Sequence, residues 1–242
     1  MTETDTAHKR EHLLEAINEA SSNVRNAYLT FLLAGLYFAI LIGSTTDEQL
    51  LRESGVTLPL LSIDLPIIGF YVVAPPLFLL LHLNMLLMFS LLADKLSPLR
   101  DSLADLPPLE RNHWMFRVAT FPFTQLWLRD TKVGGTHFFL QLFVWLSIAI
   151  LPPVVLQWAL LRFLCYQDDA ITFLHQMLLI ADIVLLVGFW SKVVPNGSIT
   201  QARPVLSYSL KGIAGVVVVV TFFASVPRGG FRTAFRRLAG CR

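Results

Sequence analysis

A long uncharged run in the first half of the chain decides its fold class: residues 66–93 read PIIGFYVVAPPLFLLLHLNMLLMFSLLA. As a helix, these 28 residues would extend about 42 Å, more than the roughly 30 Å hydrocarbon core of a bilayer. The helix must therefore tilt, kink or project into water, and Pro75-Pro76 predicts a kink. The run predicts a membrane-spanning helix.

Further apolar runs lie on both sides of this one, at about residues 27–44, 137–161, 170–190 and 208–226. The whole chain is 55% hydrophobic and 15% charged, against about 25% charged in soluble domains. We predict an all-α membrane protein with about five transmembrane helices. The last run is marginal, because it reaches a full span only if Lys211 extends its amine to the interface.

The polar segments divide the chain further. Residues 1–26 are polar with apolar residues at helical spacing, which predicts an N-terminal amphipathic cytoplasmic helix. Residues 27–226 form the polytopic membrane domain, and residues 227–242 form a basic C-terminal tail. Between the first two spans, Thr45 and Glu48 have capping-box spacing, and Pro59 interrupts a branched run. This predicts a short helix and then an extended segment or hairpin that caps one membrane face.

The distribution of Lys and Arg predicts the orientation. Residues 94–136 carry six basic residues, whereas residues 45–64 carry only Arg52. Because basic loops stay on the cytoplasmic side, we expect the N-terminus to be cytoplasmic. Five of the remaining basic residues lie in the tail, which a five-span topology would export.

Two patterns predict interactions of the membrane domain. Gly35, Ala39 and Gly43 fall at i, i+4 and i+8 and form a small-residue stripe, at which a partner protein or a second copy could approach. Residues 113–128 are rich in aromatic side chains, which is typical of an interfacial segment. The net charge of +2 and the interleaved acids disfavour nucleic acid as a partner.

Polar residues inside the spans are the candidates for chemistry: His82, Asn84, His175 and Asp182. One interpretation is a polar file for protons or a small ligand. The other is hydrogen bonding between helices, worth about 0.6 kcal/mol per contact. Because the sequence shows no charged pair among them, we favour hydrogen bonding. We assign no catalytic, cofactor or metal site from the sequence.

The tail carries candidate lipid-surface residues. Arg228, Arg232 and Arg236 recur at helical spacing, with Arg237 beside them, and Phe231, Phe235 and Leu238 form a second stripe. This pattern predicts a short basic amphipathic helix on an anionic membrane surface, at about 1 kcal/mol per basic residue. A solvated, irregular end is the alternative, because Gly229-Gly230 interrupts the pattern.

Two stretches resemble a known family. Residues 44–51 (STTDEQLL) and 58–75 (LPLLSIDLPIIGFYVVAP) are similar to the N-terminal membrane region of bacterial pentapeptide-repeat membrane proteins, and the segment Trp145–Ile148, Pro152 and His175 fit the same layout. The resemblance covers residues 13–226 and implies a multi-pass protein of the bacterial inner membrane. No Leu or Phe recurs at every fifth residue after Val226, so a role of the repeats does not transfer.

The sequence therefore favours a non-enzymatic membrane anchor or sensing module. The alternative is a channel or proton-coupled transporter that uses Asp182, His175 and His82. The two classes differ in what they require of these residues, because a transporter needs them to exchange protons and an anchor needs them only to hold helices together.

Overall fold

The computed structural model describes residues 3–51, 55–57, 64–104, 106–128, 135–164, 166 and 168–193. Helix dominates this part of the chain, and four helices are long and apolar enough to span a membrane. The predicted fifth span, residues 208–226, and the tail with Arg228, Arg232, Arg236 and Arg237 lie outside the described residues. The candidate spans are Arg10–Ser44, Ile67–Ala104, Leu142–Phe163 and Asp169–Trp190.

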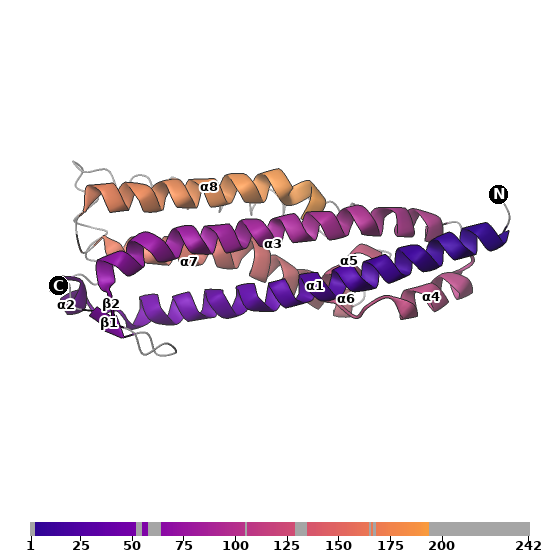
Figure 1. Cartoon of the computed structure of the whole chain (residues 1–242), viewed down its shortest axis with the longest axis horizontal. Helices are drawn as coiled ribbons and strands as arrows, with labels where there is room; N and C mark the ends of the chain where they lie inside the picture. Colours follow the sequence, from indigo (N-terminus) through magenta and orange to yellow (C-terminus); the bar gives the residue numbers. More distant parts are fainter. Residues whose placement is uncertain are drawn as a thin grey trace.

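Two long helices run the length of the molecule (Figure 1). Helix α1 covers Glu3–Ser44 and helix α3 covers Ile67–Ala104. Their 42 and 38 residues extend about 63 and about 57 Å, roughly twice the hydrocarbon core. The predicted N-terminal helix and first span are thus one continuous helix, because no proline separates them. Likewise, α3 continues beyond Ala93 for eleven residues, although it contains Pro75 and Pro76.

The turn between these helices begins one residue later than the sequence predicts. The capping box is formed by Thr46 and Gln49: the amide of Thr46 donates to Oε1 of Gln49 at 3.0 Å, and the amide of Gln49 donates to Oγ1 of Thr46 at 3.3 Å. The predicted Thr45–Glu48 box is wrong, because the Thr45 hydroxyl donates to the carbonyl of Leu41 instead. Helix α2, Asp47–Leu51, follows.

A short antiparallel pair of strands leads into α3. Strand β1 is Gly55–Thr57 and strand β2 is Asp64–Pro66, with Val56 opposite Leu65. Pro66 ends β2, and α3 begins at the next residue, Ile67. The missing amide of Pro66 costs no hydrogen bond there, because amides at the start of a helix have no helical acceptor. The two strands and α2 lie at one end of the molecule, and the N-terminus lies at the other (Figure 1).

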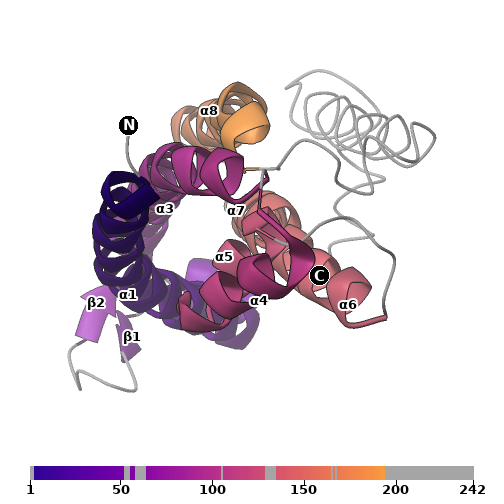
Figure 2. The same cartoon turned by 90° about the vertical axis from the view of Figure 1, so that its right-hand side faces the viewer.

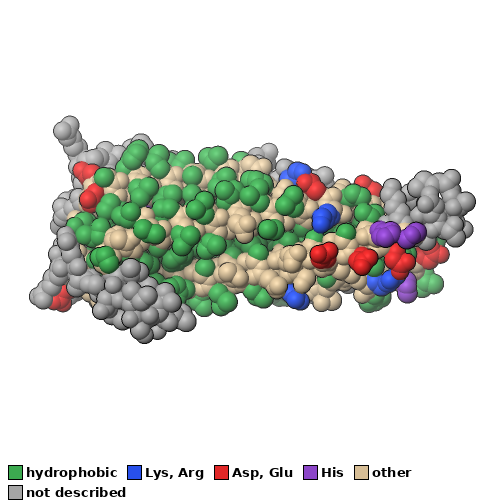
Figure 3. Space-filling model, viewed as in Figure 1, with side chains coloured by type: hydrophobic (Ala, Val, Ile, Leu, Met, Phe, Trp, Pro, Cys, Tyr) green, Lys and Arg blue, Asp and Glu red, His purple; other side chains and the backbone are tan. Residues whose placement is uncertain are grey.

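At the N-terminal end, α4 (Pro108–Arg117) and α5 (Pro122–Leu128) fold back along α1. Asn18 of α1 holds this segment in place through two hydrogen bonds. Its Nδ2 donates to the carbonyl of Arg117 at 3.1 Å, and its Oδ1 accepts from the amide of Ala119 at 2.8 Å. We call residues 3–26 of α1, 94–104 of α3 and α4 the stalk. Charged and histidine side chains gather over this end (Figure 3).

The aromatic segment at residues 113–128 is divided between surface and interior. Phe116 is 87% exposed, whereas Phe121 and Phe123 are buried. Phe121 and Phe123 pack on Phe89 of α3, with ring centroids 6.2 and 4.4 Å away. The side chains of Phe121 and Phe123 therefore fill the junction between α1, α3 and α5.

The third span is interrupted by a π-helical turn. Helix α6 is Gly135–Trp145, the π-helical turn η1 is Leu146–Ile150, and α7 is Leu151–Phe163. The wide turn ends at Ile150, just before Pro152 in the first turn of α7, and the amide of Leu151 donates to the carbonyl of Leu146, five residues back. Tyr28 of α1 donates to the Ser147 hydroxyl within this turn, at 2.6 Å.

Helix α8, Asp169–Val193, completes the bundle. The Asp168 carboxylate accepts from the amides of Ala170 and Ile171, which satisfies two free donors at the start of the helix. At its other end, Lys192 lies 2.5 Å from Asp94 of α3. Viewed end-on, α3 and α8 lie side by side, and α1, α3 and α7 surround the core (Figure 2).

Large apolar side chains cover the outside of the bundle where the charged residues end (Figure 3). Leu33 is 66%, Leu80 60% and Val187 69% exposed. In water such a surface would be an association site, but on helices of spanning length it is the surface that faces lipid. The bundle is therefore apolar outside, and its stalk is polar.

The small-residue stripe of α1 lies against its own chain. A Cβ at Gly35 would come 3.3 Å from Leu151 and 3.4 Å from Phe78, and one at Gly43 would come 3.1 Å from Trp158. The helices that approach α1 at these glycines are therefore α3 and α7. A homo-oligomer or partner protein at this stripe stays a prediction.

We predict that Gly35→Leu destabilises the bundle by about 1–3 kcal/mol, because the new side chain overpacks against Leu151 and Phe78. Gly188→Leu is the matched control, since nothing lies within 4 Å of a Cβ there. It should be neutral or stabilising by up to about 1 kcal/mol through helix propensity. Reversible unfolding in mixed detergent measures both, and equal effects would contradict the packing role of Gly35.

Candidate functional site

A histidine and an aspartate meet inside the bundle, partway along α3 and α8. Nδ1 of His82 lies 2.5 Å from Oδ1 of Asp182, and both side chains are 0% exposed. A carboxylate in the middle of a span costs at least ~2.5–3.5 kcal/mol on insertion scales, so it needs a partner. The imidazole of His82, one hundred residues away in sequence, provides that partner.

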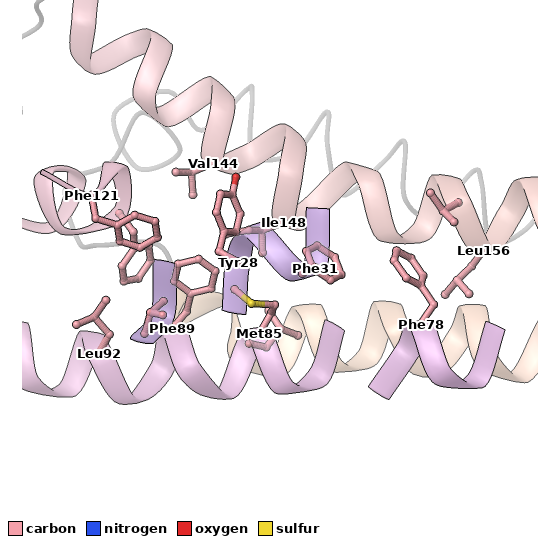
Figure 4. Close-up of a cluster of buried hydrophobic side chains, with 14 of the residues drawn as sticks. Tyr28, Phe31, Phe78, Met85, Phe89, Leu92, Phe121, Val144, Ile148 and Leu156 are labelled. Atoms are coloured by element: carbon pink, nitrogen blue, oxygen red, sulfur yellow. The ribbon is translucent and has the colours of Figure 1, made fainter. Parts of the chain in front are cut away.

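The neighbours of His82 hold its ring in place. His82 is on the buried face of α3, one turn from Phe78 and Met85. Phe31 of α1 stacks on the imidazole at a centroid distance of 5.6 Å and 22°, and it also stacks on Phe78 at 5.5 Å and 10°. Figure 4 shows Phe31, Phe78 and Met85 within one cluster. Phe31 therefore covers one face of the imidazole and helps to hold it beside Asp182.

Helix α8 presents a polar face to the interior and an apolar face to the outside. Its buried residues are Thr172, His175, Gln176, Leu179 and Asp182, all but one of them polar. Its outward residues are apolar and exposed: Phe173, Met177, Val184 and Val187. This is the reverse of a helix in water, because lipid rather than solvent surrounds the bundle.

His175 satisfies a carbonyl that a proline leaves free. In an α-helix the carbonyl of Tyr71 would accept from the amide of residue 75, but Pro75 has none. Nε2 of His175 lies 2.9 Å from this carbonyl oxygen and donates to it. His175 thus compensates for the proline and ties α8 to α3, about two turns of α8 before the His82–Asp182 contact.

The contact between Nδ1 of His82 and Oδ1 of Asp182 has the distance of a short hydrogen bond. Nε2 of His82 and Oδ2 of Asp182 are buried and have no hydrogen-bond partner among the described residues. A buried polar atom without a partner costs free energy of folding. Its presence in a native structure therefore calls for a structural or functional reason.

The remaining candidates do not join this site. Asn84 is exposed, so it lies on the lipid side of α3 rather than in the interior with His82. Two residues of helix rotate a side chain by 200°, so Asn84 points away from the face that carries His82.

The pairing itself was not predicted from the sequence. No charged pair is evident among the polar residues of the spans, whereas the structure brings His82 and Asp182 together. No local spacing could reveal a contact across one hundred residues. One signal was available for His175: a proline inside a span frees a carbonyl, which must find a donor elsewhere.

No group of three or more His, Cys, Asp or Glu side chains in the described part of the chain is placed to hold a metal ion. Comparison with known proteins returned no match to a family model, a curated protein or a solved structure. The resemblance to pentapeptide-repeat membrane proteins therefore stays a prediction.

We predict a coupling energy of about 1–2 kcal/mol between His82 and Asp182 in a double-mutant cycle, near the upper end for polar contacts in membrane bundles. His82→Leu and Asp182→Leu each leave one buried polar group unpaired, so each should cost more than half of what the double variant costs. Reversible unfolding in mixed detergent provides the four stabilities.

Asn84→Leu is the control on the same helix. It removes a polar group that faces lipid, so it should leave stability unchanged or raise it. A coupling energy near zero for His82 and Asp182 would mean that the two side chains do not form the contact in the membrane.

Proposed function

We propose that the protein is a non-enzymatic membrane module that anchors a helical stalk at the membrane surface and holds it in a fixed orientation. The observation that carries this proposal is the continuity of α1 and α3. Each passes from the lipid-facing bundle into the stalk without a break. The bundle and the stalk are therefore parts of the same two helices.

The contacts within the stalk support the same proposal. The two hydrogen bonds of Asn18 fix the end of α4 and the residues that follow it to α1. The ion pair between Arg117 and Glu11 is exposed and contributes at most about 1 kcal/mol, so the asparagine contacts fix the register. A shift of α3 within the membrane would reach the stalk through one rigid helix, which is what a sensing module requires.

We further propose that the stalk lies in the cytoplasm of a bacterial cell and that the bundle lies in the inner membrane. The basic residues 95, 100, 111 and 117 all belong to the stalk side, which the positive-inside rule places in the cytoplasm. In this topology residues 208–226 form a fifth span, and the strand pair β1–β2 caps the opposite face.

Cysteine labelling tests the anchor, in a background in which Cys165 and Cys241 are serine. Glu15→Cys and Ser102→Cys place thiols on the stalk, and Leu77→Cys places one on the apolar surface, where Leu77 is 49% exposed. An impermeant thiol reagent should label the two stalk sites only after the cells are opened. It should leave position 77 unlabelled throughout.

The chain should also stay with the membrane through an alkaline wash. Labelling of position 77 from water would disprove the lipid-facing surface. Labelling of the stalk sites in intact cells would reverse the orientation.

A second function, proton-coupled transport, is favoured by one observation: the buried His82–Asp182 pair with its two unpartnered atoms. Liposomes that contain the protein decide between the two functions when a pH gradient is imposed. The anchor predicts proton flux equal to that of empty liposomes. Transport predicts a faster flux that Asp182→Asn abolishes and Asn84→Leu preserves, and this result would replace the anchor proposal.

A further inference from the structure

The stalk carries two histidines one helical turn apart on the open face of α1. His8 and His12 are both exposed, and their ring centroids lie 4.5 Å apart with 30° between the ring planes. Glu15 and Glu19 continue the same face at i+7 and i+11 from His8 and are also exposed. Histidine side chains lie next to acidic ones on this part of the surface (Figure 3).

We propose that His8 and His12 form a bidentate binding site for a divalent transition-metal ion. Imidazole nitrogen is a preferred ligand of Zn²⁺, Ni²⁺ and Cu²⁺, and Cu²⁺ binds most tightly in this series. Two histidines at i and i+4 on one helix face are also the spacing with which helical zinc sites hold their metal. Water completes the coordination, because two imidazoles supply only part of it.

The local charges favour a cation on this face. Glu15 lies one turn from His12 and Glu19 one turn further, so two carboxylates flank the imidazoles. Arg10 is 200° around the helix from His8 and therefore on another side. The acidic residues add attraction that salt screens, whereas the coordinate bonds to nitrogen are not screened.

The proposal covers binding and not catalysis. The spacing of His8, Glu11 and His12 also matches the H-x-x-E-H pattern of certain zinc peptidases, in which the glutamate acts on the metal-bound water. Here the Glu11 carboxylate forms an ion pair with Arg117 at 3.0 Å. Glu11 therefore takes part in the contact between α1 and α4.

Metal binding would act on the stalk through mass action. Only the helical conformation keeps the two imidazoles one turn apart, so a bound ion stabilises the helix relative to its unfolded form. The first turns of α1 would then be more ordered with metal than without it. The stalk tip would respond to the concentration of the ion, and this property is independent of whether the bundle anchors or transports.

Titration of the full-length protein in lipid nanodiscs, without an affinity tag, tests the site. Isothermal titration with Cu²⁺ and with Zn²⁺ should give one site per chain, and the electron paramagnetic resonance spectrum of bound Cu²⁺ should show nitrogen ligands. His8→Gln and His12→Gln should each weaken binding at least tenfold, because each removes the chelate. Glu15→Gln should weaken it less.

His113→Gln is the matched control, since His113 is an exposed histidine on α4 with no second histidine a turn away. It should bind metal as the wild type does. Zn²⁺ should also slow amide hydrogen exchange in the first turns of α1 in the wild type and not in His8→Gln/His12→Gln. Undiminished binding in that double variant, or no binding by the wild type, would overturn the proposal.

Discussion

The constraint on which this structure depends is that, in lipid, every backbone polar group must find its partner within the protein. Prolines in the spans break that rule locally. In α3, Pro75 leaves the Tyr71 carbonyl without its helical donor, and His175 of α8 donates instead. This contact satisfies the backbone of one helix and at the same time joins it to another. In the third span, the helix widens into a π-helical turn before Pro152, where the Leu151 amide donates to Leu146.

The interface between α3 and α8 shows why such contacts matter more here than in a soluble bundle. Burial of leucine gives little preference for one helix pairing over another, because lipid is as apolar as the core. Specificity must come from close packing and from polar groups. Three polar contacts lie along this interface, at Tyr71–His175, His82–Asp182 and Asp94–Lys192. Each fixes the same parallel register, so sliding α8 along α3 would break all three together.

The sequence predicts the helical class and four of the spans, because length without charge is the direct requirement of a bilayer. It also predicts which spans hold ionisable groups. It does not predict which of these groups meet, since His82 and Asp182 come from helices whose relative rotation depends on packing. For Asn84 the helical angle already separates its side chain from that of His82. The capping box shifted by one residue because Thr45 bonds back to Leu41, a choice that residue types alone do not decide.

The position of the His82–Asp182 pair connects the chemistry of the bundle to the stalk. His82 lies on α3, and twelve residues further along the same helix Asp94 marks where charged residues begin. Phe31 of α1 stacks on His82, so both of the helices that enter the stalk touch the pair. The pair therefore touches α8, which carries no part of the stalk, and also α1 and α3, which carry most of it. Because the contacts Tyr71–His175 and Asp94–Lys192 lie on either side of the pair along the α3–α8 interface, they hold α8 in register with α3 at the pair.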